Sequence, residues 1–195
     1  MKLIVISPET EDPREHPVLA QLFTAGLTHY HLRKPAWNRD RLAAWLRAVP
    51  AEFHPRIVAH AHHDLAVDFN IGGLHFRDAD GPLSILLRSR AVHDLATLRV
   101  SLNHYDRLLF SPVFPSISKP GRNPDPRISS DELKTILAGP RRTEAIALGG
   151  IDRSRLPACR SLGFDGVAVL GAVWHAADPI RAFTELQHAL LAHAA

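Results

Sequence analysis

The stretch from residue 144 to residue 173 constrains the fold of this chain most strongly. It reads E-A-I-A-L-G-G-I-D, then a segment of helical character, then G-F-D-G-V-A-V-L-G-A-V. Two short runs in it, 145–148 and 166–170, are continuously apolar, which is typical of parallel strands buried on both faces. Between them, Asp152 is placed to cap a helix over 153–162. The stretch therefore predicts a strand, a helix and a second strand, with a glycine turn after each strand.

The two glycine turns predict a phosphate site. Gly149 and Gly150 follow the first strand, and Gly171 and Ala172 follow the second. Loops after the last two strands of a (β/α)8 barrel commonly bind phosphate through backbone N–H groups, and glycine lets the anion approach because it has no Cβ. The simpler interpretation is that these glycines only make tight turns. We expect a phosphate site at these four residues, because two such loops one helix apart are more specific than one.

The rest of the chain continues the alternation of strands and helices. Further strands are expected near 2–7, 28–33, 55–61, 74–76, 89–92 and 108–111. Helices are expected near 16–25, 38–49, 65–69, 83–87, 93–98, 129–137 and 179–193. About eight of each, in one domain spanning 1–195, predict an α/β protein with a single parallel (β/α)8 TIM barrel. A doubly wound open sheet is the alternative, but it would carry its phosphate glycines after the first strand.

Length and composition narrow the class of protein. The chain has 195 residues, whereas this barrel typically has about 250, so we expect some abbreviated helices, chiefly within 81–106. The formal net charge is +3 and the basic residues are dispersed, whereas a nucleic-acid surface needs a basic face with interleaved aromatic residues. No apolar run reaches the length of a membrane helix or of a signal peptide. The single cysteine, Cys159, suits a reducing compartment. We therefore expect a cytoplasmic protein without nucleic-acid or membrane partners.

Polar side chains gather where the second and third strands end. Side chains alternate along a strand, so His31 and Arg33 share the inward face of the second strand, and Arg33 would project into the barrel mouth. H-A-H-H-D follows the third strand at 60–64, and we expect His60 and His62 to line the pocket with His31. His60 and His62, together with His75 on the fourth strand, could bind zinc, but the spacing is not specific. No metal ligands are therefore assigned.

Five motifs resemble those of a known family. They are H-L-R-K-P at 31–35, G-L-H-F-R-D-A-D at 73–80, F-S-P-V-F-P-S-I-S-K at 110–119, A-L-G-G-I-D at 147–152 and G-F-D-G-V-A-V-L-G-A-V at 163–173. In this order they resemble the thiamin phosphate synthase family, which includes the related thiazole tautomerases. The resemblance covers nearly the whole chain. It implies a βα barrel, a thiazole phosphate substrate and a role in thiamine (vitamin B1) biosynthesis.

The match to the synthases of this family is incomplete. They join a pyrimidine diphosphate to the thiazole phosphate and release pyrophosphate, and such chemistry needs Mg²⁺ held by carboxylates. Arg33 matches their pattern, but Pro35 replaces a lysine, and Lys34 would point to the opposite face of the strand. Ala61 replaces a metal-binding aspartate, whereas Asp80 matches the second one. The resemblance thus implies a pocket that contains Asp80 but lacks many of the synthase residues that bind the pyrimidine diphosphate and the metal ion.

The residues that match the family's contacts to the thiazole phosphate are present. The resemblance assigns phosphate contacts to Lys119 in the loop after the sixth strand, together with the hydroxyl groups of Ser116 and Ser118. A lysine in such a loop could also be merely solvated, but a charged donor near a phosphate site favours contact with the anion.

The tautomerases need a proton donor and acceptor rather than a metal ion. Histidine suits that role, because its unperturbed pKa is about 6.5. Their catalytic histidine follows the fifth strand in an S-V-H-S motif, and this chain has A-V-H-D at 91–94. The resemblance therefore implies that His93 is catalytic. The alternative is that His93 is only the residue before a helix.

Proton transfer of the thiazole tautomerase type, without a cofactor, is the preferred function. A divergent thiamin phosphate synthase that requires Mg²⁺ is the first alternative. A non-catalytic protein that binds thiazole phosphate or thiamin phosphate is the second. The expected partner is a small phosphorylated thiazole, and a homodimer is an open alternative for the oligomeric state.

Overall fold

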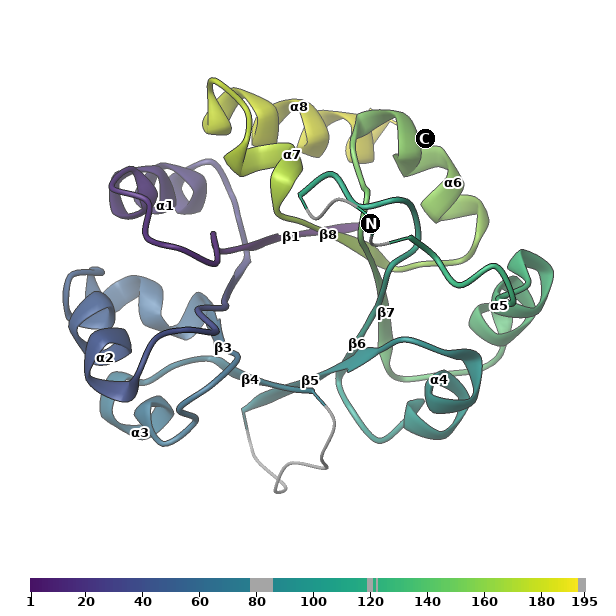
Figure 1. The fold of residues 1–195 in the computed structure, drawn as a ribbon, viewed down its shortest axis with the longest axis horizontal. Coiled ribbons are helices and arrows are strands. Elements are labelled where there is room, and N and C mark those ends of the chain that lie inside the picture. Colours follow the sequence, from purple (N-terminus) through teal and green to yellow (C-terminus); the bar gives the residue numbers. More distant parts are fainter. Residues whose placement is uncertain (78–85, 119–120, 122, 193–195) are drawn as a thin grey trace.

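Eight parallel strands form a closed barrel in the computed structural model, which describes residues 1–77, 86–118, 121 and 123–192 (Figure 1). Each strand pairs with the next, and β8 closes the ring against β1. The strands are β1 (Lys2–Ile6), β2 (His29–Leu32), β3 (Ile57–Ala59), β4 (Gly73–Phe76), β5 (Leu87–Val92), β6 (Arg107–Phe110), β7 (Glu144–Leu148) and β8 (Gly166–Val169). The predicted (β/α)8 TIM barrel is confirmed.

Helices surround the barrel, and several are short, as predicted. They are α1 (Glu15–Thr24), α2 (Arg39–Arg47), α3 (Leu65–Phe69), α4 (Leu95–Ser101), α5 (Ser130–Ala138), α6 (Leu156–Ser161), α7 (Gly171–Trp174) and α8 (Pro179–Ala192). Two 3₁₀ helices, η1 (Ala51–Arg56) and η2 (Arg153–Arg155), complete the set in the described part of the chain. Asn38, Asp94, Ser129 and Asp152 cap helices with their side chains.

Three predicted elements differ from the structure. The helix expected at 83–87 is wrong at its end, because Leu87 already belongs to β5, and residues 83–85 lie outside the described residues. Pro55 lies in η1 rather than in the third strand, since proline lacks the N–H that a strand interior needs. The single helix expected over 153–162 is a 3₁₀ turn followed by α6, whose second residue is Pro157.

The two faces of the strands bury different kinds of residue. On β1, Leu3 and Val5 belong to the large apolar core, which includes residues of the surrounding helices. Ile4 and Ile6 belong to a small separate cluster with Leu109, Ile146 and Ala168. This small cluster comes from β1, β6, β7 and β8, whereas polar residues lie buried on the other strands, namely His31 on β2, His75 on β4 and Ser89 on β5. The asymmetry makes one side of the barrel interior apolar and the other side polar.

A charged cluster lies where β6 and β7 begin. The guanidinium of Arg107, which is 1% exposed, donates from Nη2 to Oε2 of Glu144 at 2.8 Å. Lys2 also pairs with Glu144. Partial burial acts to raise the pKa of Glu144, but the hydrogen bonds from Lys2 and Arg107 outweigh it, so the pKa lies below its ordinary value. The cluster thus stabilises the end of the barrel opposite the strand carboxyl ends.

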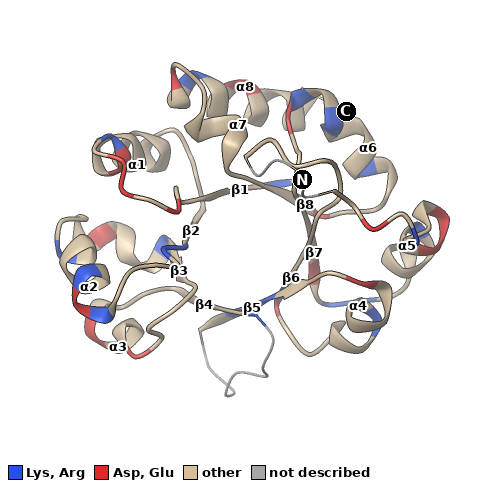
Figure 2. Ribbon diagram, viewed as in Figure 1, with Lys and Arg blue, Asp and Glu red and all other residues tan. Residues whose placement is uncertain are grey.

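Charged residues of both signs are spread over the outer helices and loops (Figure 2). Many pair between neighbouring elements, as Arg39 of α2 does with Asp64 and Asp68, and Arg99 of α4 does with Glu132 of α5. Exposed pairs of this kind contribute little stability, about 0–1 kcal/mol each. In the part of the chain that the structure describes, no helix has the length and apolar character needed to cross a membrane.

Candidate active site

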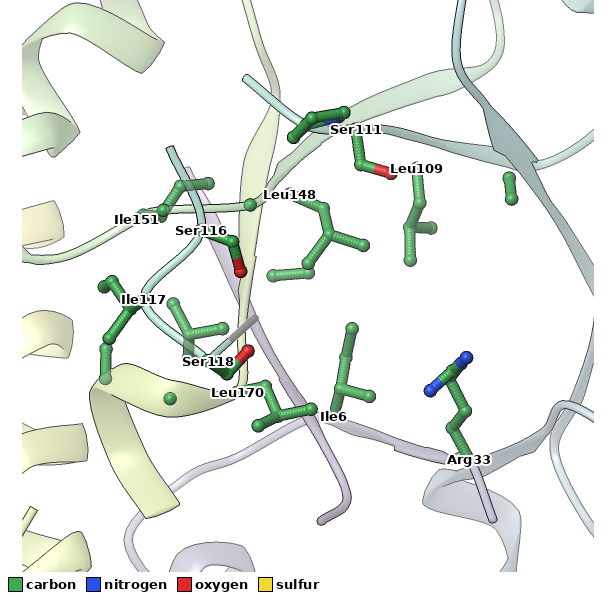
Figure 3. Close-up of a pocket in the computed structure, with 18 of the residues that line it drawn as sticks. Ile6, Arg33, Leu109, Ser111, Ser116, Ile117, Ser118, Leu148, Ile151 and Leu170 are labelled. Carbon is green, nitrogen blue, oxygen red and sulfur yellow. The ribbon is translucent and has the colours of Figure 1, made fainter. Parts of the chain in front are cut away.

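A pocket of about 170 Å³ opens at the carboxyl ends of the strands. Every strand contributes, because residues at the end of each of β1 to β8, or directly after it, line the pocket. Figure 3 shows apolar side chains, among them Ile6, Leu109, Leu148 and Leu170, between Arg33 on one side and Ser116 and Ser118 on the other. The pocket therefore combines an apolar centre with polar groups at opposite walls, as small-molecule sites usually do.

The glycine turn after β7 packs tightly against the loop after β6. Gly149 and Gly150 have φ values of +96° and +65°. A Cβ on Gly150 would lie 2.2 Å from the carbonyl oxygen of Pro115. The backbone N–H of Phe114 donates to the carbonyl oxygen of Gly149 at 3.1 Å, which joins the two loops. These glycines therefore do make tight turns, and the same turns bring the 112–118 loop against the pocket.

Backbone donors in this wall are available to an anion. The N–H groups of Gly150, Gly171 and Ala172 have no acceptor among the described residues, and all three residues line the pocket. The hydroxyl groups of Ser116 and Ser118 point into the same space (Figure 3). Unpaired N–H groups beside hydroxyl groups suit a phosphate. Lys119, which was expected to join them, lies outside the described residues.

Arg33 lies at the opposite wall. Its guanidinium points into the pocket (Figure 3) and pairs with Glu9, which lines the pocket after β1. Lys34, the next residue, points away as the strand alternation predicted. Its ammonium is fully buried and lies 2.5 Å from a carboxylate oxygen of Glu15 in α1. Lys34 therefore belongs to the core between barrel and helices and not to the pocket.

His93 lines the pocket directly after β5. Its Nδ1 lies 2.7 Å from the carbonyl oxygen of Ser111. A carbonyl oxygen only accepts, so Nδ1 of the neutral ring carries the proton and Nε2 carries the lone pair. Asp94 does not orient this ring, because its carboxylate caps α4 through the N–H of Thr97 at 2.7 Å.

Three histidine rings meet on the polar side of the barrel interior. His31 on β2 has no exposed surface, and its Nδ1 is 3.0 Å from Nε2 of His60. The rings of His60 and His75 stack with their centroids 4.0 Å apart. His60 and His75 line the pocket, whereas His31, contrary to the prediction, does not. Burial holds the pKa of His31 and of His60 well below the usual value and lowers that of His75 to about 3. All three rings are therefore neutral near pH 7.

His62 does not line this pocket, contrary to the prediction. Its Nε2 contacts the carbonyl oxygen of Trp37 at 3.1 Å instead. Its φ of +51° places it in the left-handed region, so the strand alternation does not extend to this residue. Asp80, the other predicted pocket residue in this part of the sequence, lies outside the described residues.

The described residues do not fit Mg²⁺, which prefers several oxygen ligands. Ala61 carries no ligand atom, and Glu9, the carboxylate in the pocket wall, pairs with Arg33. The other polar groups near the mouth are mainly nitrogen donors, from His60, His75 and two arginines.

Some pocket residues do not follow from the sequence motifs. Arg77 directly follows β4 and adds a second guanidinium to the wall. Ser111 orients His93 through its backbone, which no side-chain pattern reveals. His75 was expected only in a zinc arrangement, and it lines the pocket because its side chain alternates with the outward residues of β4.

A family model and curated relatives indicate the family of this chain. A family model described as thiamine monophosphate synthase matches residues 3–173. The thiamine-phosphate synthase of Haemophilus influenzae is 26% identical over 186 residues, covering 86% of this chain and 81% of the relative. That of Mycolicibacterium smegmatis is 30% identical over 138 residues, covering 66% and 60%.

Solved structures show the same similarity. Thiamine phosphate pyrophosphorylase from Bacteroides thetaiotaomicron superposes with a TM-score of 0.81 at 27% identity, covering 97% of both chains. The enzyme of the same name from Pyrococcus furiosus has a TM-score of 0.80 at 21% identity, covering 100% of this chain and 97% of the other. The second similarity shows the fold alone.

Proposed function

Because the chain belongs to the thiamine monophosphate synthase family, we propose that its pocket binds a phosphorylated thiazole. The observation that carries the proposal is the cluster of donors at Gly150, Gly171 and Ala172, beside the hydroxyl groups of Ser116 and Ser118. These groups would bind the phosphate, and the apolar centre would hold the ring. The wall with Arg33 would then face the far side of the ring.

The relatives favour the synthase reaction for this enzyme of thiamine biosynthesis. In that reaction a pyrimidine diphosphate joins the thiazole phosphate and pyrophosphate leaves. The guanidinium of Arg33 lies across the pocket from Ser116 and Ser118 (Figure 3), and Arg77 also lines the pocket. Arginine suits such a place, because it binds diphosphate oxygens through paired hydrogen bonds and stabilises the charge of a leaving group. Glu9, paired with Arg33, would hold that guanidinium in position.

Proton transfer within the thiazole is the second candidate, and His93 favours it. The hydrogen bond to the Ser111 carbonyl oxygen leaves a lone pair on Nε2. A neutral imidazole that lines the pocket can accept a proton from one ring position and return it at another. This reaction requires no metal ion, which suits a pocket whose described residues do not fit Mg²⁺.

A two-substrate assay distinguishes the candidates. The protein is incubated with the pyrimidine diphosphate and the thiazole phosphate, with and without Mg²⁺, and released pyrophosphate is measured. A parallel assay follows the tautomer of the thiazole carboxylate phosphate. Release of pyrophosphate supports the synthase, and tautomer turnover without it supports proton transfer. Tight binding of thiazole phosphate with neither turnover would leave a binding protein, and absence of binding would refute the proposal.

A further inference from the structure

We propose that His31, His60 and His75 form a binding site for one divalent transition-metal ion of the zinc class. One ring nitrogen from each of the three residues lies within 4.8 Å of the other two. The residues come from the ends of three adjacent strands, β2, β3 and β4, so the barrel brings them together. Three histidines with an open fourth position are a common arrangement for zinc. This site lies on the polar side of the barrel interior and does not depend on the phosphate donors.

A buried nitrogen points to a missing ligand. Nε2 of His31 is buried and has no hydrogen-bond partner in the part of the chain that the structure describes. Leaving such a group unsatisfied costs about 1–3 kcal/mol, and an ion is one of its ordinary explanations. His31 has no exposed surface, so bulk water does not reach it.

Ser89 prepares His75 for metal binding. Its hydroxyl donates to the carbonyl oxygen of Leu74 at 3.2 Å, so its oxygen accepts from Nδ1 of His75 at 2.9 Å. The ring proton of neutral His75 therefore lies on Nδ1, and Nε2 carries the lone pair. Metal-bound histidines are usually oriented in this way, with the second nitrogen donating to a neighbouring group.

The distances require only small movements. Nδ1 of His31 lies 3.0 Å from Nε2 of His60, so the two rings already face each other. Zn–N bonds of about 2.0–2.1 Å in a tetrahedral site give a separation of about 3.3 Å between ligand nitrogens. The widest separation, up to 4.8 Å, must shorten by about 1.5 Å to reach that value. His60 is only partly buried, so its ring has room to rotate. The open position of the ion would face the pocket, since His60 and His75 line it.

The nitrogen ligands select the class of ion. Imidazole suits zinc, copper, iron and nickel, whereas Mg²⁺ prefers oxygen ligands and retains its water. Arg33 lies near the mouth and opposes a cation there, but its charge is offset by Glu9.

Calorimetry on the metal-free protein tests the proposal. The chain is treated with a chelator, dialysed and titrated with Zn²⁺, in the absence and presence of excess Mg²⁺. We expect one strong site per chain that Mg²⁺ does not displace. Ser89→Ala keeps the three rings but removes the orienting oxygen, so it should weaken binding by about 10- to 100-fold. His75→Gln should weaken it at least as much, whereas His188→Gln, at an exposed position in α8, should have no effect.

Two results would overturn the proposal. In the first, His188→Gln reduces Zn²⁺ binding, whereas Ser89→Ala and His75→Gln do not. This result would show that surface histidines bind the ion. The other is the absence of strong Zn²⁺ binding to the folded wild type. If His75→Gln fails to fold, the nearly isosteric Ser89→Ala still decides. Thiazole phosphate binding to the metal-free protein is measured alongside, so failure of the zinc site is distinguished from failure of the phosphate site.

Discussion

At the scale of single residues, alternation along β2 separates a pocket residue from a core residue. Arg33 enters the pocket, whereas Lys34 turns outward to Glu15. The hydroxyl of Tyr30 also donates to Glu15, at 2.7 Å. Burial raises the pKa of Glu15 above its ordinary value, although hydrogen bonds from Lys34 and Tyr30 act in the opposite direction. The pair is thus a desolvated ion pair in the core.

Removing the charge of Glu15 should destabilise the protein strongly. Glu15→Gln leaves the Lys34 ammonium buried without a counter-ion, and breaking such a pair costs about 3–5 kcal/mol. Urea denaturation at pH 7 measures the free energy of unfolding. The double variant Glu15→Leu/Lys34→Met should recover most of the loss, because it removes both charges. A loss below about 1 kcal/mol in the single variant would be typical of an exposed pair and would contradict this account.

His93 carries the prediction about proton transfer. His93→Asn removes the basic nitrogen, so a reaction that depends on it should lose about 10²- to 10⁴-fold in turnover while substrate affinity is largely kept. The matched control is His104→Asn, at an exposed position. Unchanged turnover in His93→Asn, together with inactive His60 variants, would place the proton donor in the histidine cluster.

Residue patterns predicted part of the site. The inward position of Arg33 and the donors at Gly150 and Gly171 followed from alternation and from glycine turns. His62 could not be placed in this way, because its left-handed backbone ends the alternation on which the prediction relied. The tautomer of His93 depends on a carbonyl oxygen 18 positions away in sequence, which only the fold brings near.

At the scale of elements, the contact between the β7 turn and the loop after β6 sets the shape of the phosphate wall. This wall is the side of the pocket formed by Gly150, Gly171, Ala172, Ser116 and Ser118. Gly150→Ala should displace that loop, because its Cβ would lie 2.2 Å from the Pro115 oxygen. We expect a lower melting temperature and weaker binding of thiazole phosphate, measured by calorimetry. Gly121→Ala is the matched control, since Gly121 also has a positive φ, of +80°, but no atom within 4 Å of the added Cβ. Equal effects of the two variants would show backbone strain alone.

Strands with a continuous apolar run were predictable from the sequence, whereas the exact ends of helices and strands were not. Continuous apolar runs gave β1, β7 and β8. The fifth strand was expected only over 89–92, whereas β5 begins at Leu87, and Arg88 and Arg90 interrupt its apolar pattern. In the structure their guanidinium groups lie over the ring of Tyr105, 4.8 and 5.6 Å from its centroid. That contact depends on a residue beyond α4, which local sequence does not reveal.

At the scale of the whole molecule, one end of the barrel forms the pocket and the other end contains a charged cluster that contributes to stability. The carboxyl ends of the strands carry the pocket, and the other end carries the cluster of Lys2, Arg107 and Glu144. Because the pKa of Glu144 is lowered in the folded state, its ion pairs contribute stability that is present above the ordinary carboxyl value of 4.5. This contribution is lost as the pH falls through the lowered value.

Glu144→Gln should therefore destabilise the barrel in a pH-dependent way. At pH 7 we expect a loss of about 1.5–3 kcal/mol, typical of hydrogen bonds to charged groups. Below the ordinary carboxyl value the difference from wild type should shrink, since the wild-type carboxylate becomes protonated too. Glu185→Gln, at an exposed pair in α8, is the control and should change stability by less than about 1 kcal/mol. A difference that stays constant down to pH 3 would contradict the assignment.

Calorimetry with thiazole phosphate tests most directly whether the phosphate wall binds the phosphate group. A Cβ on Gly171 would lie 3.1 Å from Ile117 and 3.3 Å from Ser118, so Gly171→Val should crowd the donors without disturbing the barrel strands. We predict that the wild type binds thiazole phosphate and that the variant, folded as judged by circular dichroism, binds it at least about tenfold more weakly, a loss of about 1.4 kcal/mol. Unchanged affinity in the folded variant would show that the phosphate binds elsewhere.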